Sequence, residues 1–511
     1  MNIFICFDIL YCGHRNDIHF MMCILINTKV RKMEKYLEYF YEIASIPHGS
    51  GNIKAISDYL KNFAMENGFY VRQDEKNNIV IIRDAHPELA DHEPVILQGH
   101  MDMVAVKTAD TKKNMEEEGL DLYVEDNVLR ARGTSLGGDD GIAVAYIMAI
   151  LTGEYKTPRI EAIITVDEEI GMLGASFLDV KDITAKRMIN IDQEEEGIIL
   201  TSSAGGKVSY CNLPLERVSR EGIKYSIVIC GLSGGHSGTE IDKYRGNANV
   251  IMGRLLQKIN KEISYELISI NGGLMDNAIP RECSADIIID KENIEKLEEL
   301  VSLFENTIKN EYKSNEPDVM IYCEIDDITE PVKQEVLTES MKKRVIALLL
   351  TLPDGVIKMS LDEENLVQTS CNIGIVRTSK DEFSVNLCLR SSMESEKEAL
   401  SDKIMYITEI AGGVYSETGS YPAWEYRNDS PLRDVVLDVF KMTYGKEPVV
   451  CGIHAGLETG IFYNKMSDMD IVSIGPDILD IHTPKEKLSI SSTERVYNLV
   501  LEILRRLALG H

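Results

Sequence analysis

The sequence predicts an α/β fold in which a discontinuous first domain with a mainly parallel central sheet is interrupted by an inserted α+β domain. Three observations lead to this fold class. The chain has 511 residues, too many for one ordinary hydrophobic core. Runs rich in Ile and Val alternate with helical patterns in residues 33–207 and return after residue 411, as in sheets that are covered on both faces. Between these parts, residues 208–411 show a different mixture of strands and helices and are predicted as the insertion.

The first 32 residues differ from the rest of the chain. They are apolar, but polar residues such as Asp8, Arg15 and Asp17 interrupt them. They have no basic start, no long uninterrupted apolar run and no small-residue cleavage site, so neither a signal peptide nor a spanning helix is indicated. We expect the functional protein to start at or near Met33, and residues 1–32 are treated as an uncertain N-terminal extension.

The first part of the first domain, residues 33–207, alternates helices with strands. Two helices are expected at its start, in 33–47 and 52–68. Apolar strand-like runs and one apolar helix after a glycine-rich turn follow, in 70–84, 94–104, 136–151, 159–171 and 185–197. Strands rich in Ile and Val that alternate with helices favour a mainly parallel sheet covered on both faces.

The inserted domain, 208–411, is expected to contain strands and amphipathic helices. Its strand-like runs include 224–232, 265–270, 282–290, 365–376 and 382–392, and its helical runs include 247–263, 293–312, 341–352 and 399–413. The final part, 412–511, returns to α/β character with helices in 431–445 and 492–509 around the strand 471–476. It is therefore assigned to the first domain.

Composition excludes several classes of partner and site. Acidic residues outnumber basic ones by 83 to 54, a formal net charge of -29, which disfavours nucleic acid and anionic membrane surfaces as partners. The ten cysteines form no CxxC pair, so zinc-finger and thioredoxin-like sites lack support. Buried, reduced thiols in the cytoplasm are the simpler interpretation.

Potential metal ligands stand where apolar strands end. One strand runs into His100 and Asp102, the next into Glu168 and Glu169, a third into Asp192, and a fourth precedes His482. Open α/β sheets bind their ligands at the carboxyl edge of the strands. Each motif alone has a plainer explanation: a loop histidine, a charged surface pair, or a helix cap in the case of the GGDDG turn around Asp139. Together they offer histidines and carboxylates, a ligand set suited to Zn, Mn or Co.

The chemistry of a two-metal site assigns roles to some of these residues. A metal-bound histidine is held in one tautomer by a group that accepts its second N–H, and Asp102 stands two residues beyond His100. A general base must lie beside the water without being used up as a ligand. A Glu-Glu pair, here Glu168 and Glu169, can divide the two tasks between its members.

At these motifs the chain resembles the co-catalytic di-metal peptidases, the family that includes carboxypeptidase G, peptidase T and the aminoacylases. The aminoacyl-histidine dipeptidase branch (Xaa-His dipeptidase, peptidase D) is the most similar. The resemblance runs from about Met33 to the C-terminus. It rests on QGHMDMV (98–104), GTSLGGDDGIAVA (133–145), TVDEEIGMLGA (165–175), NIDQEEEG (190–197), GLSGGHSGTEI (231–241), RGNAN (245–249), DNAIPRE (276–282), QTSCNIG (368–374), RSS (390–392), YPAWEY (421–426), HAGLETG (454–460) and SIGPDILDIHTPKEK (473–487).

The resemblance implies a complete set of site residues. Two divalent metal ions, zinc first and manganese or cobalt as alternatives, would be held by His100, Asp139, Glu169, Asp192 and His482, with Asp139 as the bridge. Glu168 would be the base, Asp102 would orient His100, and His236 of the inserted lid would stabilise the oxyanion. Asn277, Arg390 and Gly456 would bind substrate, and the Asp139–Asp140 peptide would be cis. Departures are small: the branch often has GADD or GADN where this chain has GGDD, and Cys where it has Thr459.

The implied activity is metal-dependent hydrolysis of dipeptides, Xaa-His dipeptides first, the β-alanyl-histidine type included. A related tripeptidase or N-acyl-amino-acid deacylase is the alternative within the enzyme class. A non-catalytic metal-binding relative is the alternative outside it, but Glu168 and every predicted ligand are present. A homodimer through the inserted domain is one expectation for assembly; an insertion that supplies both halves within one chain is the other.

Overall fold

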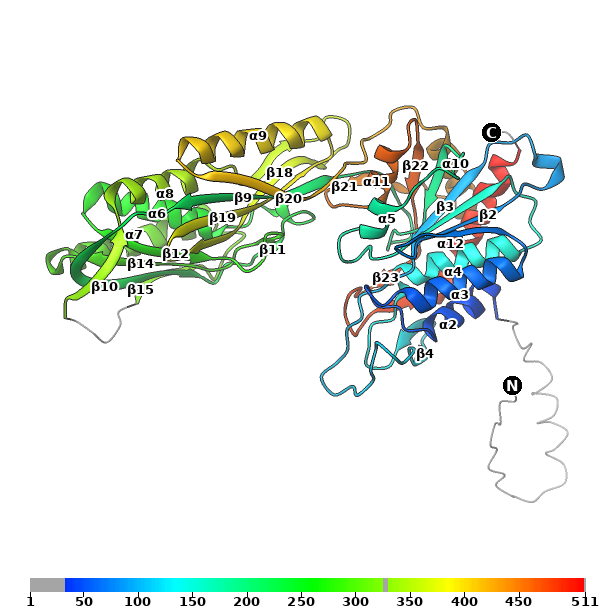
Figure 1. Cartoon of the computed structure of the whole chain (residues 1–511), viewed down its shortest axis with the longest axis horizontal. Helices are drawn as coiled ribbons and strands as arrows, with labels where there is room; N and C mark the ends of the chain where they lie inside the picture. Colours follow the sequence, from blue (N-terminus) through cyan, green and yellow to red (C-terminus); the bar gives the residue numbers. More distant parts are fainter. Residues whose placement is uncertain (1–32, 325–329, 510–511) are drawn as a thin grey trace, which may run out of the picture.

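The computed structural model describes residues 33–324 and 330–509, so the predicted extension 1–32 lies outside the described residues. Figure 1 shows the two domains end to end; at one of the two crossings a strand of the first sheet runs directly into a strand of the second. Residues from both ends of the described chain build the domain drawn at the right, and the middle of the chain builds the other. The predicted α/β class with a discontinuous first domain is therefore confirmed.

The first domain is built on an eight-stranded sheet. In spatial order its strands are β1 (Tyr70–Gln73), β2 (Ile79–Arg83), β6 (Ile160–Thr165), β3 (Val95–His100), β7 (Arg187–Asn190), β22 (Asp470–Ser473), β8 (Ile198–Ser203) and β21 (Val449–Ile453). The central strands β6, β3, β7 and β22 pair in parallel, whereas β1, β2 and β6 are antiparallel neighbours. The sheet is thus parallel at its centre and mixed as a whole.

Helices cover both faces of this sheet. One face carries α2 (Lys35–Ala44), α3 (Lys54–Glu66), α4 (Gly138–Thr152), α10 (Pro431–Tyr444) and α12 (Ile490–Leu507), and the other carries α5 (Leu173–Phe177) and α11 (Glu458–Lys465). Strand β2 shows the alternation directly: Ile79 and Ile81 join the first core, and Val80 and Ile82 join the second. This two-residue period is what a buried strand between two helical layers requires.

A small separate sheet lies beside the main one. It pairs β23 (Ile478–Leu479), β24 (Lys487–Ser489), β5 (Val128–Ala131) and β4 (Leu122–Glu125) in that order. The loop between β23 and β24 carries His482. The pairing of β24 with β5 therefore brings a segment near the C-terminus close to the segment that precedes α4.

The inserted domain is built on a ten-stranded antiparallel sheet. Its path is β15 (Met320–Glu324), β10 (Arg217–Cys230), β14 (Cys283–Ile289), β12 (Glu266–Gly272), β18 (Val367–Thr378), β19 (Glu382–Ser391), β9 (Gly205–Pro214) and β20 (Val414–Tyr421); β16 (Val332–Leu337) pairs with β10, and β17 (Gly355–Met359) with β18. A two-stranded ribbon, β11 (Gly235–His236) with β13 (Ala278–Ile279), stands apart from it.

Four helices lie on one side of the inserted sheet: α6 (Ala248–Glu262), α7 (Ile294–Glu311), α8 (Glu339–Thr351) and α9 (Glu394–Ile410) (Figure 1). Along β10 the alternate residues Tyr225, Ile227 and Ile229 enter the core beneath them. An antiparallel sheet with one packed face is the expected form for an α+β domain.

The chain passes between the two domains twice, after Ser203 at the end of β8 and before Trp424. The backbones of these two residues pair reciprocally, with Ser203 N donating to Trp424 O at 2.9 Å and Trp424 N donating to Ser203 O at 3.1 Å. The predicted boundaries fall after residue 207, within β9, and after residue 411, before β20. We therefore propose that the inserted domain runs from the start of β9 to the end of β20.

Among the described residues, no helix combines the length and the apolar character needed to cross a membrane.

Candidate metal centre

The carboxylate of Asp139 lies between two histidines. Its Oδ1 is 3.2 Å from Nε2 of His100, and its Oδ2 is 3.3 Å from Nε2 of His482. Each oxygen thus faces a different imidazole, the arrangement that a carboxylate shared by two metal ions requires.

Two groups of ligand atoms share Asp139. His100, Asp139 and Asp192 form one, with His100 Nε2 3.5 Å from Asp192 Oδ1. Asp139, Glu169 and His482 form the other, with His482 Nε2 2.9 Å from Glu169 Oε1. Within each group the ligand atoms lie within 4.8 Å of one another. The structure therefore brings together all five residues that were predicted as ligands.

The fold explains why residues so far apart in sequence meet. His100 ends β3, Asp192 follows β7, and Glu169 follows β6. These three strands are parallel neighbours, so their carboxyl ends share one edge of the sheet. Asp139 approaches the same edge from the first turn of α4, where it and Asp140 depart from helical dihedral angles. The Asp139–Asp140 peptide bond is cis, as expected.

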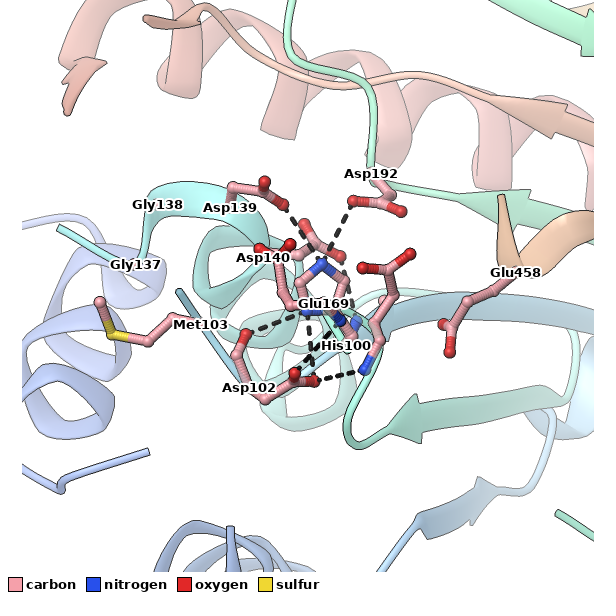
Figure 2. A network of polar contacts seen from close by, with 12 residues as sticks. His100, Asp102, Met103, Gly137, Gly138, Asp139, Asp140, Glu169, Asp192 and Glu458 are labelled. Atoms are coloured by element: carbon pink, nitrogen blue, oxygen red, sulfur yellow. Dashed lines mark hydrogen bonds and ion pairs between the residues drawn. The ribbon is translucent and has the colours of Figure 1, made fainter. Parts of the chain in front are cut away.

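Asp102 orients the imidazole of His100 through contacts at the ring nitrogen Nδ1. Nδ1 of His100 is 3.0 Å from the carbonyl oxygen of Asp102 and 3.6 Å from its Oδ1, which leaves Nε2 facing Asp139 and Asp192 (Figure 2). Asp102 itself accepts hydrogen bonds from Ser50 Oγ at 2.8 Å and from the Glu168 amide at 3.1 Å. Burial alone would raise the pKa of Asp102, but these bonds and His100 hold it below its usual value.

The charge of the cluster favours divalent cations. Burial raises the pKa of Asp192 to about 6, and burial together with Asp139 and Asp192 raises the pKa of Glu194 to about 8. The carboxylates of Asp139 and Glu169 raise the pKa of His482 to about 10. Carboxylates are thus in excess over the two imidazoles, and bound cations would supply the charge that is missing. The nitrogen and oxygen donors present fit two such ions.

Glu168 lies beside the two ligand groups without belonging to either. One of its carboxylate oxygens lies within 4.8 Å of ligand atoms of His100 and Glu169. Burial and the nearby carboxylates of Asp192, Glu458 and Glu169 raise its pKa well above the usual value. An acid of this kind, close to the ligands, can exchange a proton with a group bound there.

The other predicted site residues lie in the inserted domain or at the junction. His236 is in β11, and Nδ1 of its ring accepts hydrogen bonds from the amides of Thr239 at 3.1 Å and Gly238 at 3.3 Å. A neutral ring with this acceptor carries its proton on Nε2. Burial and Arg390 lower the pKa of His236 and so favour the neutral form. Asn277 is exposed next to β13, where its carbonyl accepts the amide of Ser237.

Arg390 and Gly456 meet at Tyr421. Nη1 of Arg390 donates to Tyr421 Oη at 2.9 Å, while its buried Nε has no hydrogen-bond partner among the described residues. Gly456 packs against the same ring so closely that a Cβ there would lie 2.6 Å from Tyr421 Cε2. Among the described residues, no hydrogen bond or ion pair joins His236, Asn277 or Arg390 to the metal-ligand groups. The structure therefore gathers the predicted residues into a ligand cluster and a separate group at the junction.

Sequence reasoning missed several polar residues that support the cluster. Asp140 accepts the amide of His100 at 3.1 Å. Glu458 is fully buried and accepts hydrogen bonds from Gln98 and Thr165, both at 2.6 Å. Glu486 accepts the amides that lead into α4. All three stand inside motifs that were singled out, but the partners of Glu458 and Glu486 are more than 290 positions away, which no local pattern reveals.

An open cleft of about 970 Å³ adjoins Glu169. Its wall is formed by residues 49–52, 103–105 and 114–117, with Lys107 and Ile170. Met103 and Met115 give it flexible apolar surface, and Glu116 and Glu117 give it negative charge. The cleft is large enough to hold an amino-acid side chain next to the ligand cluster.

The sequence matches the family described as peptidase family M20/M25/M40 over residues 96–506. It is 34% identical over 471 residues to the cytosol non-specific dipeptidase of Escherichia coli (strain K12), covering 92% of this chain and 96% of that protein. A solved structure, aminoacylhistidine dipeptidase from Vibrio alginolyticus, superposes with a TM-score of 0.86 at 33% identity and covers 92% of this chain and 96% of the other. A tripeptidase from Staphylococcus aureus, with a TM-score of 0.53 and 16% identity over 93% and 99% of the chains, shares the fold.

Proposed function

Because the chain belongs to peptidase family M20/M25/M40, we propose that it is a dipeptidase that uses two bound metal ions and accepts Xaa-His dipeptides. The observation that supports this proposal most strongly is the position of Asp139: one of its carboxylate oxygens faces His100 and the other faces His482. The names of its relatives support the substrate class: one is a non-specific dipeptidase and another an aminoacylhistidine dipeptidase. Dipeptides of the β-alanyl-histidine type belong to the proposed range.

In this proposal His100, Asp139 and Asp192 hold one divalent ion, and Asp139, Glu169 and His482 hold the other. Zinc suits the mixed nitrogen and oxygen donors, and manganese or cobalt suits them as well. When bound, the two ions would lower the pKa of a water molecule and polarise the peptide carbonyl.

Glu168 performs the proton transfers of the proposed reaction. Its carboxylate takes a proton from the attacking water and later gives it to the amine of the departing amino acid. A carboxyl whose pKa is raised by burial and by Asp192 can act in both directions near neutral pH. Asp102 keeps the ring of His100 oriented throughout, since it accepts from Nδ1.

His236 and Arg390 complete the proposed site from the lid. The Nε2–H of His236 is free to donate to the oxyanion, because its Nδ1 already accepts two amides. The unpartnered Nε of Arg390 supports binding of the substrate carboxylate, with Asn277 on the same side and Gly456 in the pocket wall. The lid must close on the first domain for His236 to act, and the Ser203–Trp424 junction is the proposed hinge.

The location and assembly of the protein follow as further parts of the proposal. The cysteines of the described part of the chain are free thiols, and the Escherichia coli relative is named a cytosol enzyme, which together support a cytoplasmic protein. Exposed Tyr406, Ile410 and Val414 on α9 and β20 support a homodimer through the lid. Sedimentation equilibrium of the wild type and I410E tests it; a wild-type monomer would instead favour a lid that is complete in one chain.

The activity is tested by hydrolysis of a panel of Xaa-His and other dipeptides, tripeptides and N-acyl amino acids. Chelated protein, metal-restored protein and a metal-restored E168Q variant are compared. The proposal expects metal-dependent cleavage of dipeptides, Xaa-His included. Cleavage of only the longer or acylated substrates would move the protein to a sister activity, and no metal-dependent cleavage of any substrate would refute the enzyme proposal.

A further inference from the structure

The side chain of Glu486 is almost wholly buried next to residues 136–139, the segment that carries Asp139. Its Oε2 accepts the amides of Leu136 at 2.7 Å and Gly137 at 3.1 Å. Its Oε1 accepts the amides of Gly138 at 2.8 Å and Asp139 at 3.4 Å. One carboxylate therefore binds four consecutive amides, the last of which belongs to the shared ligand.

These amides have no other acceptor available locally. The first N–H groups of a helix lack partners within the helix, and the cap position of α4 is Gly137, which has no side chain to accept them. Asp139 and Asp140 depart from helical dihedral angles, so the first turn of α4 is irregular. A carboxylate at such a terminus is favoured by the local dipoles. A Cβ at Gly138 would lie 3.3 Å from Glu486 Oε1, so glycine there leaves room for the close approach.

Glu486 also belongs to the loop that carries His482. It stands in the turn before β24, where its own amide donates to Thr483 O at 3.1 Å. The same residue thus connects the backbone next to Asp139 with the backbone next to His482. Among residues 33–324 and 330–509, no salt bridge joins Glu486 to a lysine or arginine, so its carboxylate is held by its hydrogen bonds to the loop amides.

We propose that Glu486 is a positioning residue that sets the separation of Asp139 and His482, and through it the binding of the metal ion held by Asp139, Glu169 and His482. Glu486 does not touch the ion or the substrate. The other ion depends on it less, because His100 and Asp192 are placed by β3 and β7. This inference rests on the two-metal centre of the proposed function.

The experiment is a stepwise Co²⁺ titration of chelated protein, followed by visible absorption and by competition with a chelating dye. The H482A variant identifies the step that belongs to the His482 ion. The E486Q variant keeps the size of the side chain but turns an NH₂ group towards backbone donors. We expect its affinity for the His482 ion to fall about 10- to 100-fold, as for other residues that orient ligands, and its affinity for the first ion to change much less.

A matched control is E161Q. Glu161 is also fully buried and accepts backbone amides, from Thr184 at 2.8 Å and Ala185 at 3.0 Å. It lies near the start of β6, whereas the metal-ligand cluster lies beyond the other end of that strand. E161Q should lower the melting temperature of the metal-free protein and leave both Co²⁺ affinities unchanged. E486D, which keeps the charge, should recover part of the lost affinity and serves if E486Q does not fold.

Two results would overturn the inference: E486Q with both Co²⁺ affinities of the wild type, or E486Q with both ions weakened equally. The wild-type titration separates this failure from that of the proposed function. A wild type that binds fewer than two ions refutes the two-metal centre. If the wild type binds two ions and E486Q binds both with wild-type affinity, only the role of Glu486 is refuted.

Discussion

At the scale of single residues, protons and metal ions compete for the same groups. In the metal-free protein, Asp139 and Glu169 draw a proton onto His482 and raise its pKa to about 10. Asp102, Asp139 and Asp192 raise the pKa of His100 well above its usual value, although burial opposes this shift. To bind a metal ion, each imidazole must be neutral and must present a nitrogen without a proton to the ion. At the proposed metal centre, binding of the ions is therefore expected to release protons near neutral pH.

This competition gives a prediction with a definite sign. The pKa of His482 is raised above its usual 6.5, so its protonation stabilises the metal-free fold fully below that value, and the contribution is lost as pH rises towards about 10. Metal affinity should change in the opposite direction and increase between about pH 7 and pH 9. Calorimetric Zn²⁺ titrations in two buffers of different ionisation enthalpy measure the protons released.

The control for this titration is H482N, which should release fewer protons on binding its remaining ion. Equal proton release by the wild type and H482N, or affinity that is independent of pH, would contradict the assignment of His482 as a ligand.

Glu168 gives the sharpest kinetic prediction. Replacing it by glutamine removes the proton acceptor but keeps the size of the side chain, so kcat for dipeptide hydrolysis should fall about 10²- to 10⁴-fold. Metal content, measured by atomic emission, should stay at the wild-type level, because Glu168 belongs to neither of the groups that share Asp139. Near-normal kcat with full metal content would remove Glu168 from the role of base.

The sequence allowed the ligands to be predicted because each belongs to a recognisable motif, and the motifs of His100, Glu169 and Asp192 follow strands directly. Glu486 could not be assigned in the same way, since its function depends on backbone amides 347 to 350 positions earlier in the chain. Backbone amides carry no residue identity, and a pattern of side chains cannot show which carboxylate they will meet. The roles of His236, Asn277, Arg390 and Gly456 stay predictions.

At the scale of elements, α4 connects the core of the first domain with its site. Every residue from Gly138 to Leu151 is buried, so the helix is apolar on all sides, as expected for one enclosed by other elements. Its first turn carries Asp139, and its middle packs against α2 and β3. Packing defects in α4 should therefore destabilise the fold and disturb the site together.

Ile147 provides the test of this packing. Its side chain is fully buried in α4, so Ile147→Ala should lower the free energy of unfolding by about 2–5 kcal/mol. The matched control is Met65→Ala in α3, where the side chain is 60% exposed and the change should stay within about 0.5 kcal/mol. Urea unfolding followed by circular dichroism measures both. Equal stability of the two variants would show that α4 is not part of a tightly packed core.

The long elements were predictable and the short ones were not. The apolar runs of β3 and β6 and the amphipathic pattern of α12 have clear periods, and each forms the expected element. The sheet of β4, β5, β23 and β24 was not predicted, because its strands have only two to four residues and pair across the whole chain. The antiparallel pairing of β2 with β6 was also missed, since strand direction depends on topology rather than on composition.

At the scale of the whole molecule, the two domains lie end to end (Figure 1), and the chain passes between them next to the paired backbones of Ser203 and Trp424. The ligand cluster is in one domain, whereas His236 and Arg390 are in the other. A mechanism that uses both groups needs the domains to approach each other. Side-chain hydrogen bonds also cross between the domains, from Thr201 and Ser202 to Glu363 and between Ser370 and His454, so closure has to rearrange these contacts.

Closure is therefore predicted to accompany substrate binding. Small-angle X-ray scattering of the metal-loaded E168Q variant should show a smaller radius of gyration when a saturating Xaa-His dipeptide is added. R390A supplies the control, because loss of the carboxylate contact should leave the radius larger at the same concentration of peptide. An identical radius with and without bound peptide would contradict a closing lid.

The discontinuous architecture was predictable because the α/β pattern stops and later resumes. The arrangement of the domains relative to each other was not, because it depends on contacts between residues far apart in the sequence, such as Ser202 with Glu363 and Ser370 with His454. The sequence pattern also located the change of domain only approximately, since β8 ends at Ser203 and β9 begins at Gly205 with no turn or linker pattern between them.

The most direct test of a two-metal dipeptidase is the release of histidine from an Xaa-His dipeptide as Zn²⁺ is added stepwise to chelated protein. Asp139 faces both His100 and His482, so the account predicts no release without metal and full activity only when two ions are bound per chain. Release by the fully chelated protein, or activity that saturates at one ion per chain, would contradict it.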